Sequence, residues 1–331
     1  MTTGLEDLQN INDVRKNIII NDELLRLGVD IASLQETRPL DSGSLKEKDY
    51  TFFWQGKSAK KRREHGVGFA VRNTLLKMVE PGGKGWERLL TLRFHTSDGP
   101  ATLISAYAPA LTSIPEAKGE FYTSFTDVIK NIPSNEHLYL LGDFNARVGA
   151  DHNSWPSFLG SFGVGKVNDN RQRLLELCSY HGLCVTNTFF QTKPQHRVSW
   201  RHPCSKHWHQ LDMIIVRRTS LKHVLLTRTY HSASCDTDHS LVCCKIRLIP
   251  KKFHRSKPQG KPRIDTTKMQ HEKMLEEFAK SFEDVISTDH THSTASEIWN
   301  HLRQCIQTSA LATFGKKTSM CCDWFDAKST R

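Results

Sequence analysis

The sequence predicts a layered α/β fold, and three observations support this prediction. Short apolar runs typical of strands dominate residues 1–249, and amphipathic helical patterns lie between some of them. Several links between neighbouring strands have hairpin length, which favours a mixed or antiparallel sheet over a purely parallel one. Strands and helices mixed in this way pack as layers around an apolar core.

The predicted elements can be placed in chain order. The first helix spans residues 13–27 and ends at Gly28, and a short apolar strand follows at 29–34. Gly, Pro and Asp turn residues separate the later elements. Further strands are expected at 51–54, 66–72, 88–94, 101–107, 137–141, 183–186, 211–217 and 241–248. Further helices are expected at 116–130 and 170–180.

A second part of the chain begins at Pro250. Residues 250–265 are rich in basic residues and proline and contain few large apolar ones, so we expect a linker. Residues 266–331 contain two amphipathic helical patterns, whose apolar faces need a covering partner. The expected organisation is therefore an α/β domain at 1–249, a basic linker and a helical tail.

The charge balance favours a polyanionic partner. The formal net charge is +11, and each phosphate that a Lys or Arg neutralises releases counterions. No apolar run is long enough to span a bilayer, and the acidic, polar N-terminus is not a signal peptide. We therefore expect a soluble protein of the nucleus, or alternatively of the cytosol, that has no membrane partner.

The cysteines indicate reduced thiols. Nine are present, an odd number, and none forms a CxxC pair. The one cluster to weigh as a zinc site consists of His202, Cys204, His207 and His209. Its spacing fits no familiar zinc finger, so a basic, His-rich loop beside an active site is the preferred interpretation.

Polar residues that suit phosphate chemistry follow several predicted strands. Side chains at strand ends project from one rim of a sheet scaffold, where functional groups usually gather. Glu36 lies in "LQET", Tyr107 in "SAYAP", Asp143 and Asn145 in "GDFN", Asp212 in "QLD", and Asp238 and His239 in "DTDH". Any one of these segments alone is weak, because a lone carboxylate at a strand end is usually only solvated. The ordered set is more specific.

This ordered set resembles the endonuclease/exonuclease/phosphatase superfamily. Its most specific marks are "GDFN" after an apolar strand and "DH" shortly before the last apolar strand, and the resemblance covers roughly Asp13 to Ile249. More narrowly, "LISAYAP", "GDFNARVG", "SKHWH" followed by "LD", and "DWFD" resemble LINE-type retrotransposon endonucleases and the craniofacial development protein 2-like family. In full-length elements a reverse transcriptase follows, and this sequence contains no such pattern.

The resemblance implies a DNase I-like fold, a four-layer sandwich of two mixed β-sheets flanked by helices, with the active site at one end. It also implies metal-assisted hydrolysis. Glu36 would hold Mg²⁺, with Mn²⁺ as an alternative, and Asp238 would lie near the metal and the leaving group. A hard cation of this kind needs only one or two carboxylates, because it keeps several waters. Asp143 would orient and deprotonate the attacking water, and Asn145 would support that water and the phosphate.

The remaining implied roles concern the phosphate. His239 would contact a non-bridging phosphate oxygen, and Asp212 would set the tautomer of its imidazole and raise its pKa. Tyr107 would donate a hydrogen bond to the phosphate or to the departing oxygen. Together these groups would activate water and neutralise the developing charge, the two requirements of phosphodiester hydrolysis.

Residues that contact DNA are expected in three places. A basic loop consists of Lys60, Lys61, Arg62 and Arg63, and a solvated charge run is the competing interpretation. Asn170 and Arg173 lie in "NDNRQR", where members of the superfamily approach substrate. Trp200 is suited to stack on a base or deoxyribose, although a core position is equally compatible with its sequence context.

The sequence departs from the family pattern at its beginning. Family members start with a strand that carries an Asn, often in a "WN" pair, whereas here "MTTGLEDLQNIND" leads almost directly into the first helix. An N-terminal strand and one ligand of the metal shell are therefore missing from the pattern. Loss of a buried strand leaves unpaired backbone groups and uncovered apolar surface, which impairs folding or activity.

Three hypotheses remain. The first is a Mg²⁺-dependent DNA endonuclease of LINE-type origin that nicks one strand and leaves a 3′-hydroxyl. The second is a relative that acts on abasic DNA or on small phosphate esters, although the net charge favours nucleic acid over a small substrate. The third is a catalytically impaired, domesticated protein that binds DNA or chromatin. The expected partner is DNA, with chromatin proteins as further candidates, and the expected state is a monomer.

Overall fold

The computed structural model describes residues 6–57, 65–80, 85–233, 237–252, 264–286 and 295–317. By its internal contacts the chain divides into two compact units, Met1–Phe253 and His254–Arg331. The predicted DNA contacts at Lys60, Lys61, Arg62 and Arg63 lie outside the described residues. Among the helices of the described ranges, none combines the length and the apolar character needed to cross a membrane.

The first two layers of the larger unit are a helix and a four-stranded sheet. Helix α1 (Glu6–Arg26) covers one face of the sheet, where Leu24 is buried against Ala32, Tyr50 and Phe52. The strands follow the order β1-β4-β3-β2, and every pair is antiparallel. Their bounds are Ile31–Gln35 for β1, Ser42–Lys46 for β2, Tyr50–Gln55 for β3 and Val67–Arg72 for β4.

The third layer is a six-stranded sheet in the order β5-β6-β7-β8-β12-β9. Strands β7 and β8 are parallel, and the other pairs are antiparallel. The bounds are Gly85–Trp86 for β5, Leu89–Thr96 for β6, Gly99–Tyr107 for β7, His137–Asp143 for β8, Leu183–Val185 for β9 and Asp212–Arg217 for β12.

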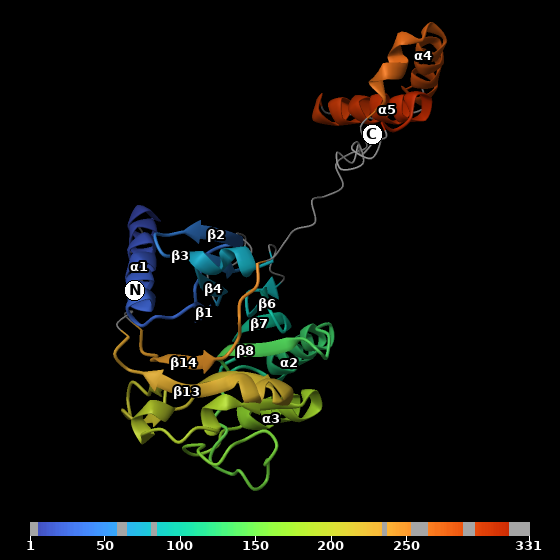
Figure 1. Ribbon diagram of the computed structural model, residues 1–331. Coiled ribbons are helices and arrows are strands. Elements are labelled where there is room, and N and C mark those ends of the chain that lie inside the picture. The colour runs from blue at the N-terminus through green and yellow to red at the C-terminus, as the bar shows by residue number, and fades with distance from the viewer. Residues whose placement is uncertain are drawn as a thin grey trace, which may run out of the picture. The chain divides into compact units, whose positions relative to one another are not determined.

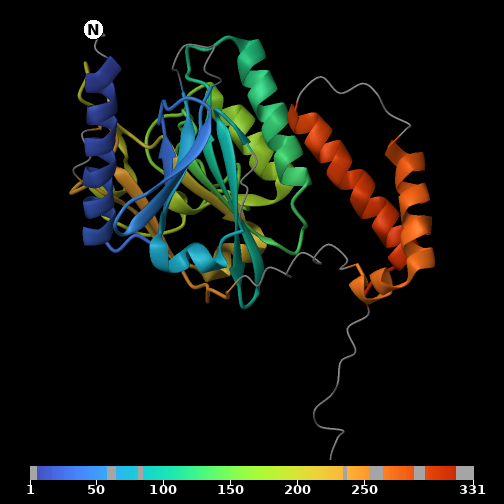
Figure 2. The ribbon, with the colours of Figure 1, turned by 90° about the horizontal axis from the view of Figure 1, so that it is seen from above.

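Helices α2 (Pro115–Lys130) and α3 (Asn170–His181) form the fourth layer. Phe125 and Leu174 from these helices are buried against Leu138 and Leu140 of the sheet. Figure 1 and Figure 2 show α1 on one side of the stacked sheets and the green helices on the other. The expected four-layer α/β sandwich is confirmed. In the described chain, however, only the six-stranded sheet is mixed, so the expectation of two mixed sheets was wrong.

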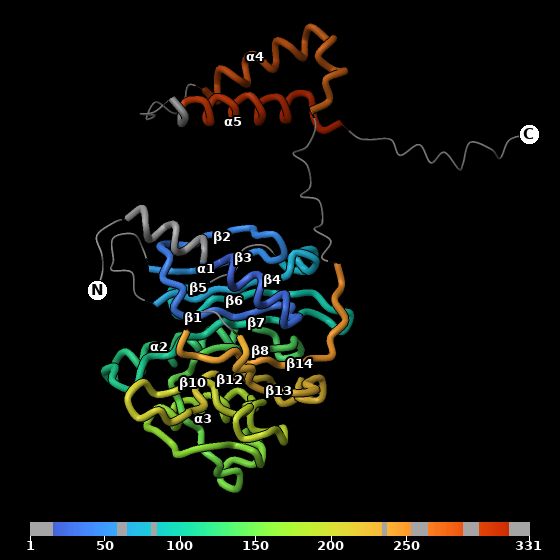
Figure 3. Tube along the Cα trace, turned by 90° about the vertical axis from the view of Figure 1, so that its left-hand side faces the viewer, coloured from blue at the N-terminus to red at the C-terminus, as the bar shows by residue number. Residues whose placement is uncertain are grey.

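Two further strands form a separate ribbon. Strands β13 (Val224–Tyr230) and β14 (Leu241–Ile246) pair in an antiparallel manner, and Figure 3 shows them running side by side. The sequence reading missed β13, because Thr and Arg alternate with its apolar residues. It also missed the edge strand β2 and the two-residue pair β10 (Trp200–Arg201) and β11 (Trp208–His209).

The smaller unit contains the two predicted tail helices, α4 (Glu272–Ile286) and α5 (Ala295–Phe314). Phe278 of α4 lies with its ring centroid 5.4 Å from that of Phe314, which is completely buried. The hydroxyl of Ser309 donates to the carbonyl of Ser281 at 3.3 Å. Each helix therefore covers part of the apolar face of the other.

Candidate active site

Two carboxylates meet where neighbouring strands pair. Asp143 is the last residue of β8 and Asp212 is the first residue of β12, and the two are direct register partners in the antiparallel ladder. Side chains of residues opposite each other in a ladder project to the same face of the sheet. The strand pairing therefore brings together two acidic groups that are distant in sequence.

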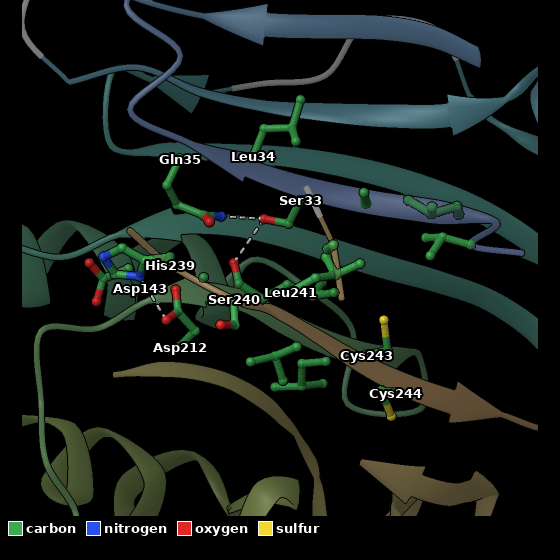
Figure 4. A pocket seen from close by; sticks show the side chains of 18 of the residues that line it. Ser33, Leu34, Gln35, Asp143, Asp212, His239, Ser240, Leu241, Cys243 and Cys244 are labelled. Carbon is green, nitrogen blue, oxygen red and sulfur yellow. Dashed lines mark hydrogen bonds and ion pairs between the residues drawn. The ribbon is translucent and has the colours of Figure 1, made fainter. Parts of the chain in front are cut away.

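His239 completes this cluster from the segment that precedes β14. Its Nδ1 lies 2.8 Å from Oδ2 of Asp212 (Figure 4). Burial alone would lower the pKa of His239. The hydrogen bond and negative charge of Asp212 outweigh burial, helped by the charges of Asp143 and Asp238, and raise this pKa to about 9. The imidazole is therefore protonated at neutral pH, so that Nε2 is also a donor.

Asp143 is only 6% exposed. Burial is the largest cause that raises the pKa of Asp143, and the neighbouring negative charge of Asp212 raises it further. His239 and the backbone amide of Asn145, which donates to Oδ1 at 2.8 Å, oppose this shift, and the resulting pKa is about 7. A carboxylate with such a pKa can accept a proton near neutral pH.

Glu36 and Tyr107 form a second polar pair at the same cavity. Glu36 follows β1 directly with a left-handed φ of 52°, and the Tyr107 hydroxyl donates to its Oε1 at 2.6 Å. Nη2 of Arg38 donates to the other carboxylate oxygen at 3.1 Å. Burial, and after it the hydrogen bond to Glu36, raise the pKa of Tyr107, so the phenol keeps its proton.

Arg88 contacts the site residue Tyr107 from outside the cavity, and the sequence did not identify it. Its Nη1 donates to the Tyr107 carbonyl at 3.0 Å, and Nη2 lies 2.9 Å from Nε2 of His65. The guanidinium carbon also stands 5.2 Å from the centroid of the Tyr107 ring. The only signal in the sequence was a charged residue at the start of an apolar strand, which is too common to identify a site.

Trp200 holds Asp238. The indole Nε1 donates to Oδ2 of Asp238 at 2.8 Å, and Trp200 also forms an isolated antiparallel bridge with His239. The ring centroids of Trp200 and His209 are 5.8 Å apart. Trp200 is therefore part of the wall of the site, and its stacking on a nucleotide remains a prediction.

The asparagines after β8 shape a loop. Asn145 has a φ of 47°, and its Nδ2 donates to the Ala108 carbonyl at 2.9 Å, so this amide group is committed to backbone. Asn170 is 3% exposed and donates to the Asn145 carbonyl at 3.0 Å. It is not placed to contact DNA, contrary to the prediction, because burial in the sandwich turns it inward. Arg173 is half-buried on α3 and does not line the cavity.

The donor set suits a hard cation that retains waters. Glu36, Asp143, Asp212 and Asp238 all line one cavity, and the proximity of like charges contributes to the raised pKa of Asp143. Across the described residues, no three His, Cys, Asp or Glu side chains are grouped as a ready-made metal cage. Mg²⁺ needs no such cage, because one or two carboxylates and waters suffice. Carboxylate oxygens therefore fit Mg²⁺.

Hydrogen bonds from its own backbone to a histidine help to shape the His-rich loop. Nδ1 of His202 accepts hydrogen bonds from the backbone amides of Cys204 and Ser205, at 3.2 Å and 3.0 Å. His209 instead lies beside Arg147, whose Nη1 is 3.5 Å from its Nδ1. This geometry agrees with the interpretation as a loop beside the active site.

Comparison with known proteins relates the chain to one curated group. Craniofacial development protein 2 of Bos taurus is 28% identical over 237 residues, which cover 70% of this chain and 39% of the relative. The same protein of Tragulus javanicus is 27% identical over 237 residues, which cover 70% of this chain and 41% of that relative. The chain thus spans about two fifths of the length of these relatives. No protein-family model matches the chain.

Solved structures show the same architecture. The endonuclease domain of TRAS1, a telomere-specific non-LTR retrotransposon, superposes with a TM-score of 0.51 and 14% identity, covering 70% of this chain and 92% of that domain. The catalytic domain of Xenopus laevis APE2 superposes with a TM-score of 0.55 and 16% identity, covering 72% and 90%. The chain is therefore similar to craniofacial development protein 2 over 237 residues and shares the DNase I-like fold of these endonuclease domains.

Proposed function

We propose that the chain is a Mg²⁺-dependent phosphodiesterase that nicks one strand of DNA and leaves a 3′-hydroxyl, and that it derives from a LINE-type retrotransposon. The observation that carries this proposal is that Asp143, Asp212 and His239 converge where β8 ends and β12 begins, at one end of the six-stranded sheet. The similarity to the endonuclease domain of a non-LTR retrotransposon supports the origin. The raised pKa of Asp143 and the protonated His239 support the chemistry.

Asp143 is the proposed general base. Its carboxylate is fixed by the Asn145 amide, and its pKa of about 7 allows it to accept a proton from water at neutral pH. The proton moves from the water to a carboxylate oxygen, and the resulting hydroxide attacks phosphorus. The bond between phosphorus and the leaving sugar oxygen then breaks, and that oxygen takes a proton from the Tyr107 phenol, which regains one from solvent, to become the 3′-hydroxyl.

His239 and Tyr107 are the proposed donors to the phosphate. Asp212 accepts from Nδ1 of His239, which leaves Nε2–H to donate to a non-bridging oxygen. Charge on that oxygen increases in the transition state, so a fixed cationic donor stabilises it more than the ground state. The phenol of Tyr107 keeps its proton and is available to the leaving oxygen.

Glu36, with Asp238 nearby, would hold Mg²⁺, or Mn²⁺ as an alternative, and the bound cation would supply charge neutralisation at the phosphate. The Tyr107 hydroxyl and the Arg38 guanidinium already orient the Glu36 carboxylate. Trp200 orients Asp238 in the same manner.

DNA is the proposed substrate, and the nucleus is the proposed location. The formal net charge of +11 favours a polyanion, and Arg38 next to Glu36 keeps 65% of its side chain exposed. Lys60, Lys61, Arg62 and Arg63 remain proposed contacts to the DNA backbone, and Trp200 remains a proposed stacking residue.

A plasmid-nicking assay tests this proposal. Purified protein is incubated with supercoiled plasmid in Mg²⁺ or in EDTA, together with Asp143→Asn and the matched control Asp127→Asn, which changes an exposed carboxylate on α2. We expect Mg²⁺-dependent conversion to open circles that falls by about 10²- to 10⁴-fold in Asp143→Asn and is unchanged in the control. Extension of the nick by a polymerase reports the 3′-hydroxyl. Nicking that survives in Asp143→Asn would contradict the assignment of the base.

A second candidate function is DNA or chromatin binding without cleavage. The formal net charge of +11 favours it, because that charge attracts a polyanion whether or not the strand is cut. A folded protein that retards duplex DNA in a gel but never nicks plasmid would support this alternative. The same result would exclude the endonuclease.

A further inference from the structure

Three histidines surround the indole of Trp200 beside the candidate active site. Trp200 of β10 is the register partner of His209 on β11, and it forms an antiparallel bridge with His239. Residues opposite each other on neighbouring strands project to the same face. His202 follows Trp200 by two positions, so in an extended chain it projects to that face as well. The ring centroids of His202, His209 and His239 lie 5.4 Å, 5.8 Å and 6.2 Å from that of Trp200.

Each of the three imidazoles has one N–H group left to donate. Nδ1 of His202 accepts from two backbone amides, and Nδ1 of His239 lies 2.8 Å from the Asp212 carboxylate. Nδ1 of His209 lies 3.5 Å from Nη1 of Arg147, and it must be the acceptor because a guanidinium only donates. A neutral imidazole whose Nδ1 accepts carries its proton on Nε2. Within the described chain, no residue accepts from Nε2 of these three histidines.

The surroundings of these donors favour an anion. The side chains of Arg147, His202, His209 and His239 all line the cavity of the candidate active site. Burial is the largest cause that lowers the pKa of His209, and the neighbouring Arg147, His202 and His207 lower it further. A site that disfavours one more positive charge attracts a negative one. Phosphate suits this site, because a guanidinium presents a planar fork of donors and the Nε2–H groups add further donors.

The donors form two groups that Trp200 separates. Trp200 lies on the middle strand of its row and therefore stands between His239 and His209. Arg147 contacts His209, and His202 is close enough to His209 to act on its pKa, so both belong with His209. A nucleic-acid strand alternates phosphates with nucleosides, and aromatic side chains stack on its bases. Two groups of phosphate donors on either side of an indole therefore fit one nucleoside with a phosphate at each end.

We propose that His202, His209 and Arg147 form a second phosphate subsite, which binds the phosphate next to the scissile one on the same strand, with the intervening nucleoside against Trp200. This inference rests on the proposed function, because it takes His239 as the contact to the scissile phosphate. The ligand is a strand with at least two successive phosphates. Small phosphate esters carry only one phosphate, so the subsite selects a polynucleotide over them.

A nucleoside with two phosphates tests the subsite without cleavage. The probe is thymidine 3′,5′-bisphosphate, and thymidine 3′-monophosphate and 5′-monophosphate are its single-phosphate controls. Each is titrated into the full chain in EDTA, and binding is followed by NMR at the imidazole Cε1 protons and the indole Nε1 proton. We expect the bisphosphate to bind about tenfold or more tightly than either monophosphate, because it adds charge-assisted hydrogen bonds at the second subsite.

Substitutions within the subsite locate this preference. Arg147→Gln and His209→Phe remove donors and should bring binding of the bisphosphate to within about twofold of the monophosphates. Arg201→Gln and His207→Phe are the matched controls, because both positions are exposed on the same hairpin and lie outside the cavity. These two variants should keep the wild-type preference. Arg147→Gln keeps the test decisive if His209→Phe fails to fold.

Kinetics connect the subsite to the proposed reaction. In nicking assays, Arg147→Gln should raise KM for DNA about tenfold and leave kcat within about twofold of wild type, because it removes binding that ground state and transition state share. Hydrolysis of bis(p-nitrophenyl) phosphate should be unchanged in this variant, since that ester has no second phosphate.

The outcomes separate this inference from the proposed function. Equal binding of the bisphosphate and the monophosphates by the wild-type chain would overturn the second subsite, even if the protein nicks DNA. A preference that survives in both Arg147→Gln and His209→Phe would also overturn it. A preference that these variants abolish, in a protein that never nicks DNA, would support the subsite and contradict the endonuclease.

Discussion

Asp143 and Asp212 face each other as register partners on β8 and β12, and His239 lies 2.8 Å from the second of these carboxylates. Two acids at one point on a sheet repel each other when both are ionised. The imidazolium of His239 offsets part of that repulsion. Its positive charge lowers the pKa of Asp143, and the two carboxylates in turn raise the pKa of His239. The pKa values of Asp143 and His239 therefore depend on each other, and the charge of Asp212 acts on both, which leads to the first two predictions.

Replacement of Asp212 by Asn should lower the pKa of His239. The wild-type value is about 9, and the hydrogen bond and charge of Asp212 are the largest influences that raise it. Without them, burial dominates and the pKa moves toward or below the usual histidine value of about 6.5. Titration of the imidazole Cε1 proton by NMR in EDTA measures the shift. An unchanged pKa in Asp212→Asn, matching the control Asp127→Asn, would contradict the assignment.

Replacement of Asp143 by Asn should stabilise the metal-free protein at neutral and basic pH. The folded-state pKa of Asp143 is raised from 3.8 to about 7, because the folded protein favours the protonated acid. The contribution of Asp143 to the free energy of unfolding is therefore fully present below pH 3.8 and is lost as the pH rises through 7. The amide side chain of the Asp143→Asn variant stays neutral at every pH, so the variant does not lose this stability when the pH rises. We expect the Tm in EDTA at pH 8 to be roughly 2–4 °C above wild type, equivalent to about 1 kcal/mol, with a smaller difference at pH 5.

Differential scanning calorimetry at both pH values checks this prediction. Asp127→Asn serves as the control, since that carboxylate is exposed on α2. A variant that is less stable than wild type at pH 8, or a difference that shrinks as pH rises, would mean that Asp143 is not destabilised by its surroundings.

Replacement of Trp200 by Phe should reduce nicking without unfolding the protein. The change removes the Nε1–H that donates to Asp238 at 2.8 Å but keeps an aromatic ring against His239. We expect a loss of about tenfold in nicking rate, equivalent to roughly 1.4 kcal/mol, and little change in Tm because the bond is exposed. Trp208→Phe is the matched control, at a position that is 42% exposed. Equal activity in the two variants would remove Asp238 from the proposed chemistry.

Mg²⁺ should stabilise the folded protein, and Glu36→Gln should weaken this effect. A ligand that binds only the folded state stabilises it by about 2.7 kcal/mol at a concentration 100 times its Kd. Thermal unfolding in a series of Mg²⁺ concentrations measures the shift. Glu116→Gln changes an acidic residue in the first turn of α2 and should respond to Mg²⁺ like wild type. An identical response in Glu36→Gln would exclude Glu36 as a ligand.

Replacement of Phe125 by Ala should be strongly destabilising. Phe125 is completely buried between α2 and the six-stranded sheet, and its ring stacks on that of Phe144. Loss of a buried aromatic side chain costs about 3–5 kcal/mol, because a cavity remains. Urea unfolding measures the change. The control is Val167→Ala, at a position that is 48% exposed, and it should stay within about 0.5 kcal/mol of wild type.

Local patterns in the sequence predicted much of the fold. The apolar run before "GDFN" became β8, and the helical pattern ended by Gly28 became the second half of α1. Strand β13 was missed because only long-range pairing with β14 reveals that its Thr and Arg residues alternate across a sheet. Asn170 was assigned to DNA because members of the superfamily approach substrate in its segment, yet tertiary packing buries it.

The sequence by itself determined which side chains stand at strand ends, because hydrophobic periodicity and turn residues act over a few neighbouring positions. Together with the resemblance to the superfamily, these positions identified Glu36, Tyr107, Asp143, Asp212 and His239 as members of one candidate site. Only the tertiary structure decided which of them touch and what burial does to their pKa values. Strand register and desolvation depend on segments far apart in the chain, and no local pattern encodes them.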